Sequence, residues 1–556
     1  MEEKTPIELP EKYYLDYFEY VLSFIQKKYD TLLNEQENDF IRKYHALSED
    51  ARCLFIRFAN RRHFFFRMQK LNYAEIANLQ TSATELEDKG FISGLGGYHQ
   101  SELDELLQIF TKNEVLVILH KINKALKKEA SRLKKPEIVE LITTQVDPAQ
   151  FIQHIAESEP VIRMHYDAEL EMIKFLFFGS IHGDMTQFVV RDIGYMKMEE
   201  VDEEKLRPLF KTRQEAEDKL YISKIYENYK LLQDTEPAEK LYDWFLSLAL
   251  DPSSLSEVAR PRCDRLALSL GKFMEQNKLD EAALAVYSFT QKPPSRERQV
   301  RLLHKLGRET EALYLCEEIN LNPQNAEEHY FAQDFLNRIS VKKRTRSTTD
   351  FLKNSPVVAL EESYRYQVEL GVLTHYIENG HEGAFTENYL WRSLFGLVFW
   401  DIIFDPDSEA LHHPLQIMPS DFYTHDFYKK RKLLIHERLN ILSRPRKFRQ
   451  LILEHFETKA GTNNPLVHWD EMVLPLVFKC HQKLEPRQLG SVLVEMAKKP
   501  RENVRGFPDL FVWNQEDYHF IEVKSPTDQL SAQQLFWLHF FQQQGIQAHV
   551  ARVQWK

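Results

Sequence analysis

One short stretch, residues 506–524, constrains the fold of this chain more than any other. It holds an apolar run at 510–513, a polar tetrad at 514–517 and a second run at 518–524. The second run alternates in polarity and is rich in aromatic and β-branched residues. Two such runs around a polar turn predict a β-hairpin.

Three ionisable side chains come together on this hairpin. Residues two apart on a strand share a face, so Glu522 and Lys524 point the same way and Val523 points into the core. Asp509 lies where the first strand begins, which allows the hairpin to bring its carboxylate beside Glu522. Two carboxylates and a lysine at one sheet edge can hold a hard divalent cation and orient a water for attack on a phosphodiester.

The residues around the hairpin resemble a known group of nucleases. Pro508-Asp509, twelve residues and then Glu522-Val523-Lys524 resemble the PD-(D/E)xK superfamily. The continuation to Gln534 looks like the virus-type replication-repair (VRR) nuclease domain. Upstream, Glu387 precedes an apolar L-F-G-L-x-x-W-D-I helix, which resembles the Fanconi-associated nuclease family of structure-specific DNA repair nucleases. We see no N-terminal zinc finger of the kind that longer members carry, so a short form is expected.

The resemblance and the residue chemistry together assign roles. The expected catalytic residues are Asp509, Glu522 and Lys524. The expected ligands of Mg²⁺ or Mn²⁺, with two ions in the site, are Glu387, Asp509, Glu522 and the carbonyl of Val523. Groups expected to support the ligands near the phosphate are Asp528 and Gln534. The alternative for Glu522 and Lys524 is an ordinary exposed ion pair on a strand.

Contacts with nucleic acid must come from local basic patches, because the formal net charge is −12. Arg61 and Arg62 lie among phenylalanines in a helix expected over 49–68. They could grip phosphates or form the rim of an amphipathic helix. Lys124 and Lys128 lie on a lysine-rich face of a helix expected at about 113–133, which resembles the family's SAP-like DNA-binding module. A solvated lysine face is the alternative.

Paired helices of about fifteen residues between 213 and 339 predict a short α-solenoid, and a generic scaffold is the alternative. In the resembling family this region lines the DNA path, and arginines near its helix starts hold a 5′ phosphate. The candidates here are Arg260, Arg262 and Arg298. Guanidinium groups that converge at helix N-termini would suit a phosphate.

The expected fold is multidomain and mostly α, with a C-terminal α/β nuclease domain. Its expected parts are a helical N-terminal DNA-binding region (1–72), a SAP-like DNA-binding region (73–170), a TPR-like helical domain (171–340), a basic linker (341–358) and a VRR-type nuclease domain (359–556). Within them, helices are also expected at 13–29, 73–86, 361–377 and 389–403, and Ser531 is expected to open a helix with a capping box.

The resemblance implies a metal-dependent endonuclease that cuts 5′ flaps and branched DNA, with 5′→3′ exonuclease activity, in DNA repair such as interstrand-crosslink repair. A Holliday-junction resolvase, a restriction-like endonuclease and a non-catalytic DNA-binding scaffold are the alternatives. No apolar stretch reaches membrane-spanning length, and the four cysteines are far apart. We therefore expect an intracellular protein located with the DNA, in the cytoplasm or nucleoid of a bacterium or the nucleus of a eukaryote. Neither a membrane partner nor a small-molecule cofactor is expected, and protein partners stay open.

Overall fold

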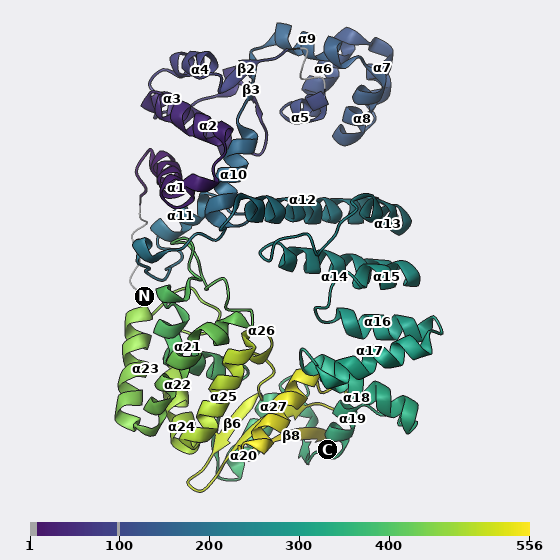
Figure 1. Ribbon diagram of the computed structural model, residues 1–556, viewed down its shortest axis with the longest axis vertical. Helices are drawn as coiled ribbons and strands as arrows, with labels where there is room; N and C mark the ends of the chain where they lie inside the picture. The colour runs from purple at the N-terminus through teal and green to yellow at the C-terminus, as the bar shows by residue number, and fades with distance from the viewer. Residues whose placement is uncertain (1–7, 97–100) are drawn as a thin grey trace. The chain divides into compact units, whose positions relative to one another are not determined.

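The computed structural model describes residues 8–96 and 101–556, so the first seven residues of the region expected at 1–72 lie outside the described residues. The chain divides into two compact units, Met1–Tyr195 with Pro208–Ala216, and Met196–Arg207 with Glu217–Lys556. Most of the regular structure is helical, and the strands form two small sheets (Figure 1). The expected multidomain, mostly helical fold is confirmed. Across the described ranges, every helix is too short or too polar to cross a membrane.

The first unit combines helices with a three-stranded antiparallel sheet. Its outer helices are α1 (Tyr13–Tyr29), α2 (Glu35–His45), α3 (Glu49–Ala59), α4 (Leu79–Asp88), α10 (Asp167–Phe178) and α11 (Thr186–Asp192). The sheet has the order β1 (Phe65–Arg67), β3 (Val161–Met164) and β2 (Ile92–Gly94). The helix expected at 13–29 is confirmed. Because Phe66 of β1 lies opposite Ile162 of β3, this sheet joins the regions expected at 1–72 and 73–170.

The helix expected over 49–68 is wrong in its second half. α3 ends at Ala59, and the chain then enters β1, where Phe66 stacks on Phe58 with ring centroids 4.2 Å apart. Pairing with a distant strand decides the outcome, as it often does for short apolar runs. Arg61 and Arg62 consequently lie exposed in the loop between α3 and β1. Similarly, the helix expected at 73–86 begins only at Leu79.

Five short helices form a module with its own core in the first unit. They are α5 (Leu103–Gln108), α6 (Lys112–Ile122), α7 (Lys124–Ala130), α8 (Lys135–Gln145) and α9 (Pro148–Ser158). The single helix expected at about 113–133 is wrong, because Asn123 leaves helical geometry and caps α7 by accepting a hydrogen bond from the Leu126 N–H. Lys124 and Lys128 are exposed on α7.

Paired helices then follow one another along the chain, as the α-solenoid pattern predicts (teal to green in Figure 1). They are α12 (Arg213–Thr235), α13 (Ala238–Ser247), α14 (Arg260–Gln276), α15 (Asp280–Tyr287), α16 (Ser295–Lys305), α17 (Glu309–Leu321) and α18 (Ala326–Ser340). The basic segment expected as a linker contains a helix, α19 (Ser347–Lys353). It is attached to α18, because the Ser347 N–H donates to Asp334 over 2.9 Å.

The C-terminal part is built on a five-stranded sheet. Its order is β4 (Val357–Leu360), β8 (Ala548–Trp555), β7 (Tyr518–Lys524), β6 (Leu510–Trp513) and β5 (Glu382–Phe385). β4, β8 and β7 run parallel, whereas β7, β6 and β5 form an antiparallel meander, so the expected hairpin is β6–β7. Its helices are α20 (Val368–Glu378), α21 (Tyr389–Ile403), α22 (Asp426–Leu439), α23 (Pro445–Lys459), α24 (Val473–Lys483), α25 (Pro486–Lys498), α26 (Pro500–Asn503) and α27 (Ala532–Gln543). The helix expected over 361–377 begins only at Val368.

The two faces of this sheet carry different side chains, as strand alternation requires. One face packs aliphatic residues such as Val512 and Ile521 against α20. On the other face Phe511 stacks on Phe520 with centroids 4.6 Å apart, and Phe520 contacts Trp391 of α21 and Phe541 of α27. The even-numbered residues of β7 therefore direct their side chains toward α21 and α27. The capping box expected at Ser531, which starts α27, is confirmed.

Candidate active site

The register of the hairpin brings two carboxylates together. Leu510 pairs with Ile521, and the next position outward places Asp509 opposite Glu522. The Val523 N–H donates to Oδ2 of Asp509 over 2.7 Å, which fixes that carboxylate against β7. The Val523 side chain itself is buried in the aliphatic core, as alternation predicts.

Glu522 is 1% exposed and is held from two sides. The Lys524 ammonium lies 2.8 Å from its Oε1, and the Gln534 amide of α27 donates to the same oxygen. Its Oε2 is buried and has no hydrogen-bond partner among the residues that the structure describes. Lys524 is 9% exposed, so the pair is not the exposed strand ion pair considered from the sequence.

This crowding of carboxylates makes their charged forms costly. Burial raises the pKa of Asp509 to about 6. Burial, and next the neighbouring Asp509 charge, raise the pKa of Glu522 to about 8, against the effect of Lys524. A divalent cation beside the unpartnered Oε2 of Glu522 would stabilise the charged forms of both acids. A set of ligands made only of oxygen atoms suits a hard cation. The residues present therefore fit the metal that the sequence predicts.

Glu387 lies beside this pair rather than within it. It follows β5 and is exposed, but the preceding Thr386 N–H donates to the backbone oxygen of Asp509 over 2.7 Å. The Glu387 charge contributes to the raised pKa of both Asp509 and Glu522. Asp528, by contrast, accepts from the Ser525 N–H over 2.8 Å and closes the loop after β7. The structure thus brings Gln534 to Glu522 directly and gives Asp528 a loop contact.

The arginines expected near a 5′ phosphate each have a contact within the protein. Arg298 is paired with Glu275, and the guanidinium carbon of Arg262 lies 5.1 Å from the ring centroid of Tyr226. Nε of Arg260 donates to the backbone oxygen of Leu255 over 3.4 Å.

A cavity of about 600 Å³ in the second unit is lined by other basic residues, together with an equal number of acidic ones. Arg265 of α14 lines it opposite Arg501 and Arg505, which lie just before the hairpin. All three are exposed, and none forms an ion pair with a residue in the described ranges. Sequence reasoning missed this set because Arg265 is more than two hundred residues from Arg501 and Arg505. The basic residues immediately before Gly506 were the available signal.

Comparison with known proteins finds similarity to Fanconi-associated nucleases. A family model described as "FAN1, HTH domain" matches residues 12–93, and one described as "VRR-NUC domain" matches residues 443–555, which include Asp509, Glu522 and Lys524. A Fanconi-associated nuclease 1 homolog of Pseudomonas aeruginosa is 28% identical over 560 residues, covering 98% of this chain and 97% of the relative. Over nearly its whole length, the chain is similar to a Fanconi-associated nuclease.

Other Fanconi-associated nucleases match the chain over different lengths. The Arabidopsis thaliana homolog is 23% identical over 96% of this chain and 66% of its own length. The human Fanconi-associated nuclease 1 is 31% identical over 193 residues, 34% of this chain and 19% of the human protein. A crystal structure of paFAN1 bound to 5′ flap DNA with a two-nucleotide flap and a gap superposes with a TM-score of 0.82 at 25% identity, covering 99% of this chain and 100% of that one. These similarities support a structure-specific DNA nuclease, and a domain of the VRR-NUC type suggests dependence on divalent metal.

Proposed function

We propose that this nuclease cuts 5′ flaps and related branched DNA with Mg²⁺ or Mn²⁺ held by Asp509, Glu522 and Glu387. The carbonyl of Val523 would be a further ligand, and two ions would share the site. The observation that carries this proposal is the buried carboxylate pair, with the Oε2 of Glu522 unpartnered among the described residues. DNA repair, including the repair of interstrand crosslinks, is the process that such a cleavage would serve.

Each side chain has a separate task in this proposal. The Val523 N–H holds Asp509, while Lys524 and Gln534 hold Oε1 of Glu522 and leave its Oε2 directed at the site. The Lys524 ammonium also orients the attacking water and offsets negative charge that develops on the phosphate. The metal, when bound, supplies charge neutralisation and a hydroxide near neutral pH.

The substrate proposal rests on the cavity lined by Arg265, Arg501 and Arg505. A terminal phosphate monoester carries more charge than an internal diester, and several guanidinium groups can recognise it together. The paFAN1 structure holds 5′ flap DNA, which supports a flap as the substrate here. An end held in this cavity would allow the enzyme to measure from a 5′ terminus, for flap cleavage and for 5′→3′ exonuclease steps.

The test compares DNA of the same sequence as 5′ flap, Holliday junction and plain duplex, with and without Mg²⁺ or Mn²⁺. We expect fastest cleavage of the flap, and no cleavage in EDTA. A preference for the junction by a dimeric form, seen by size analysis of the complex, would favour a resolvase instead. Binding without cleavage under every metal condition would favour a non-catalytic scaffold.

A further inference from the structure

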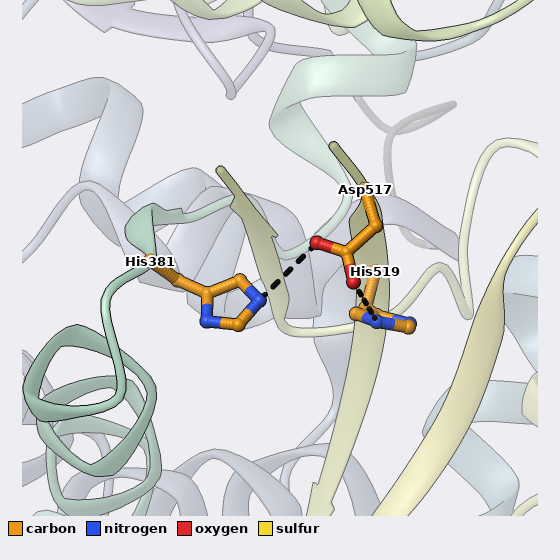
Figure 2. A group of neighbouring side chains, drawn as sticks. All are labelled: His381, Asp517 and His519. Atoms are coloured by element: carbon orange, nitrogen blue, oxygen red, sulfur yellow. Dashed lines mark ion pairs between the residues drawn. The ribbon is translucent and has the colours of Figure 1, made fainter. Parts of the chain in front are cut away.

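The sheet carries a second group of side chains of the types that bind metal ions, at the end away from Asp509 and Glu522. Asp517 closes the turn of the β6–β7 hairpin, His519 is the second residue of β7, and His381 immediately precedes β5. Strand alternation directs His519 to the face opposite to that of Glu522. The two groups are therefore separated by the sheet itself. In Figure 2 the Asp517 carboxylate lies between the two imidazoles.

The distances within this group suit a shared ion better than direct hydrogen bonds. Nε2 of His381 lies 3.4 Å from Oδ1 of Asp517, and Nε2 of His519 lies 3.5 Å from Oδ2. One ligand atom from each residue lies within 4.8 Å of the others. Hydrogen bonds between nitrogen and oxygen are usually shorter, at 2.7–3.2 Å. Ligand atoms on one tetrahedral zinc ion, with bonds of about 2.0–2.1 Å, are about 3.3 Å apart.

The same side chains have unmet bonding capacity. Oδ1 of Asp517 and Nδ1 of His381 are buried and have no hydrogen-bond partner in the described part of the chain. The Asn514 amide donates to Nε2 of His381 over 3.2 Å, and an ion bound to Nε2 would replace this hydrogen bond. Oδ1 of Asn514 accepts from the Glu516 and Asp517 N–H groups, each over 2.8 Å, which fixes the turn that presents Asp517.

We propose that His381, Asp517 and His519 bind one divalent transition-metal ion of the zinc type, with water as the fourth ligand. Two imidazoles and one carboxylate favour Zn²⁺ over Mg²⁺, which prefers oxygen ligands in an octahedron. One ligand precedes β5 and the other two belong to the β6–β7 hairpin, so the ion would link β5 to the hairpin. Since β5 leads directly to Glu387, the ion would hold the backbone on which the catalytic centre is built, without taking part in cleavage.

The test uses untagged, full-length protein carrying Asp509→Ala and Glu522→Gln, so that the catalytic carboxylates cannot hold an ion. After EDTA treatment and dialysis, Zn²⁺ is titrated by calorimetry, and Co²⁺ absorption reports the ligand geometry. We expect one Zn²⁺ per chain, a higher melting temperature with Zn²⁺, and no competition by millimolar Mg²⁺. Absence of a stoichiometric Zn²⁺ in this protein would overturn the proposal and leave a metal-free ion-pair network.

The ligands are then tested by adding His381→Gln and His519→Gln, with Asp517→Asn as a separate isosteric variant. Each should lower the Zn²⁺ affinity by at least about a hundredfold while circular dichroism stays unchanged. The matched control is His304→Gln, an exposed histidine 3.6 Å from Glu309 without a second imidazole, which should bind Zn²⁺ as before. Equal affinity in all variants would place the ion elsewhere. In the chain with intact carboxylates, the two histidine changes should leave Mg²⁺-dependent cleavage near the unaltered rate.

Discussion

At the scale of single residues, the catalytic centre depends on acids that the fold makes costly to ionise. Glu522 is almost fully buried, and its neighbour Asp509 is fixed by a backbone N–H. Lys524 relieves only part of this cost, because Oε2 of Glu522 keeps no partner among the described residues. In the proposed mechanism, this uncompensated negative charge would attract the cation to the position where the phosphate is cut.

Removing either carboxylate should abolish cleavage but leave DNA binding largely intact, because these groups hold metal rather than DNA. The change is Asp509→Ala or Glu522→Gln, measured by cleavage of a labelled flap and by fluorescence anisotropy. Glu516→Gln, an exposed acid in the hairpin turn, serves as the control and should cut normally. Mg²⁺-dependent activity in either purified variant would show that the metal is held elsewhere.

Lys524→Ala removes the cation that orients the water and offsets charge in the transition state. We expect the cleavage rate to fall by at least about a hundredfold, the range seen when one electrostatic donor is lost. Single-turnover rates at saturating enzyme separate this loss from weaker binding. Lys498→Ala, a surface lysine paired with Glu495, is the control. Turnover close to that of the unaltered enzyme in a folded variant would make Lys524 a structural residue.

The raised pKa of Glu522 also predicts how stability depends on pH without metal. Between about pH 4.5 and about 8 the unfolded chain loses this proton whereas the folded chain keeps it. The folded state then binds more protons, so the free energy of unfolding should decrease as the pH rises through this window. Urea unfolding in EDTA at pH 5.5 and pH 8 should show a smaller decrease for Glu522→Gln, and added Mg²⁺ should reduce the decrease for the unaltered protein. Equal decreases without metal would contradict the shift.

At the scale of elements, the proposed phosphate cavity depends on two segments far apart in the chain. Helix α14 supplies Arg265, and the segment that includes α26 supplies Arg501 and Arg505. If the proposed cavity binds a 5′ phosphate, the solenoid would contribute to substrate choice as well as to support.

A matched pair of double variants can locate this cavity. Arg265→Ala with Arg501→Ala should remove the preference for 5′-phosphorylated over 5′-hydroxyl flaps, because the monoester loses its guanidinium partners. Arg260→Ala with Arg262→Ala, the pair expected from the sequence, should keep that preference. Initial rates on the paired flaps decide between them. If only the second pair removes the preference, the sequence-based assignment is the correct one, and if the unaltered enzyme shows none, neither pocket exists.

At the scale of the whole molecule, the elements set by local sequence could be predicted, and those set by contacts with distant residues could not. The helix at Tyr13–Tyr29, the capping box at Ser531 and the β6–β7 hairpin follow from periodicity and turn residues. The chain after Ala59 could not be predicted, because β1 owes its form to β3 about a hundred residues later. The burial of Glu522 likewise comes from α21 and α27, which the sequence predicts as helices without indicating that they pack on this face of the sheet.

The sheet order has a consequence for the time at which the enzyme becomes active. β7, which carries Glu522 and Lys524, pairs with β8 along one edge, and β8 pairs with β4 along its other edge. The paired residues of β4 and β8 are about 200 positions apart in the chain. Pairings over such separations must first overcome the entropy of closing a long loop, so they form late in folding. The helical parts and the local β6–β7 hairpin can then be complete while the carboxylates are still exposed to water. A partly folded chain would be unable to cut DNA.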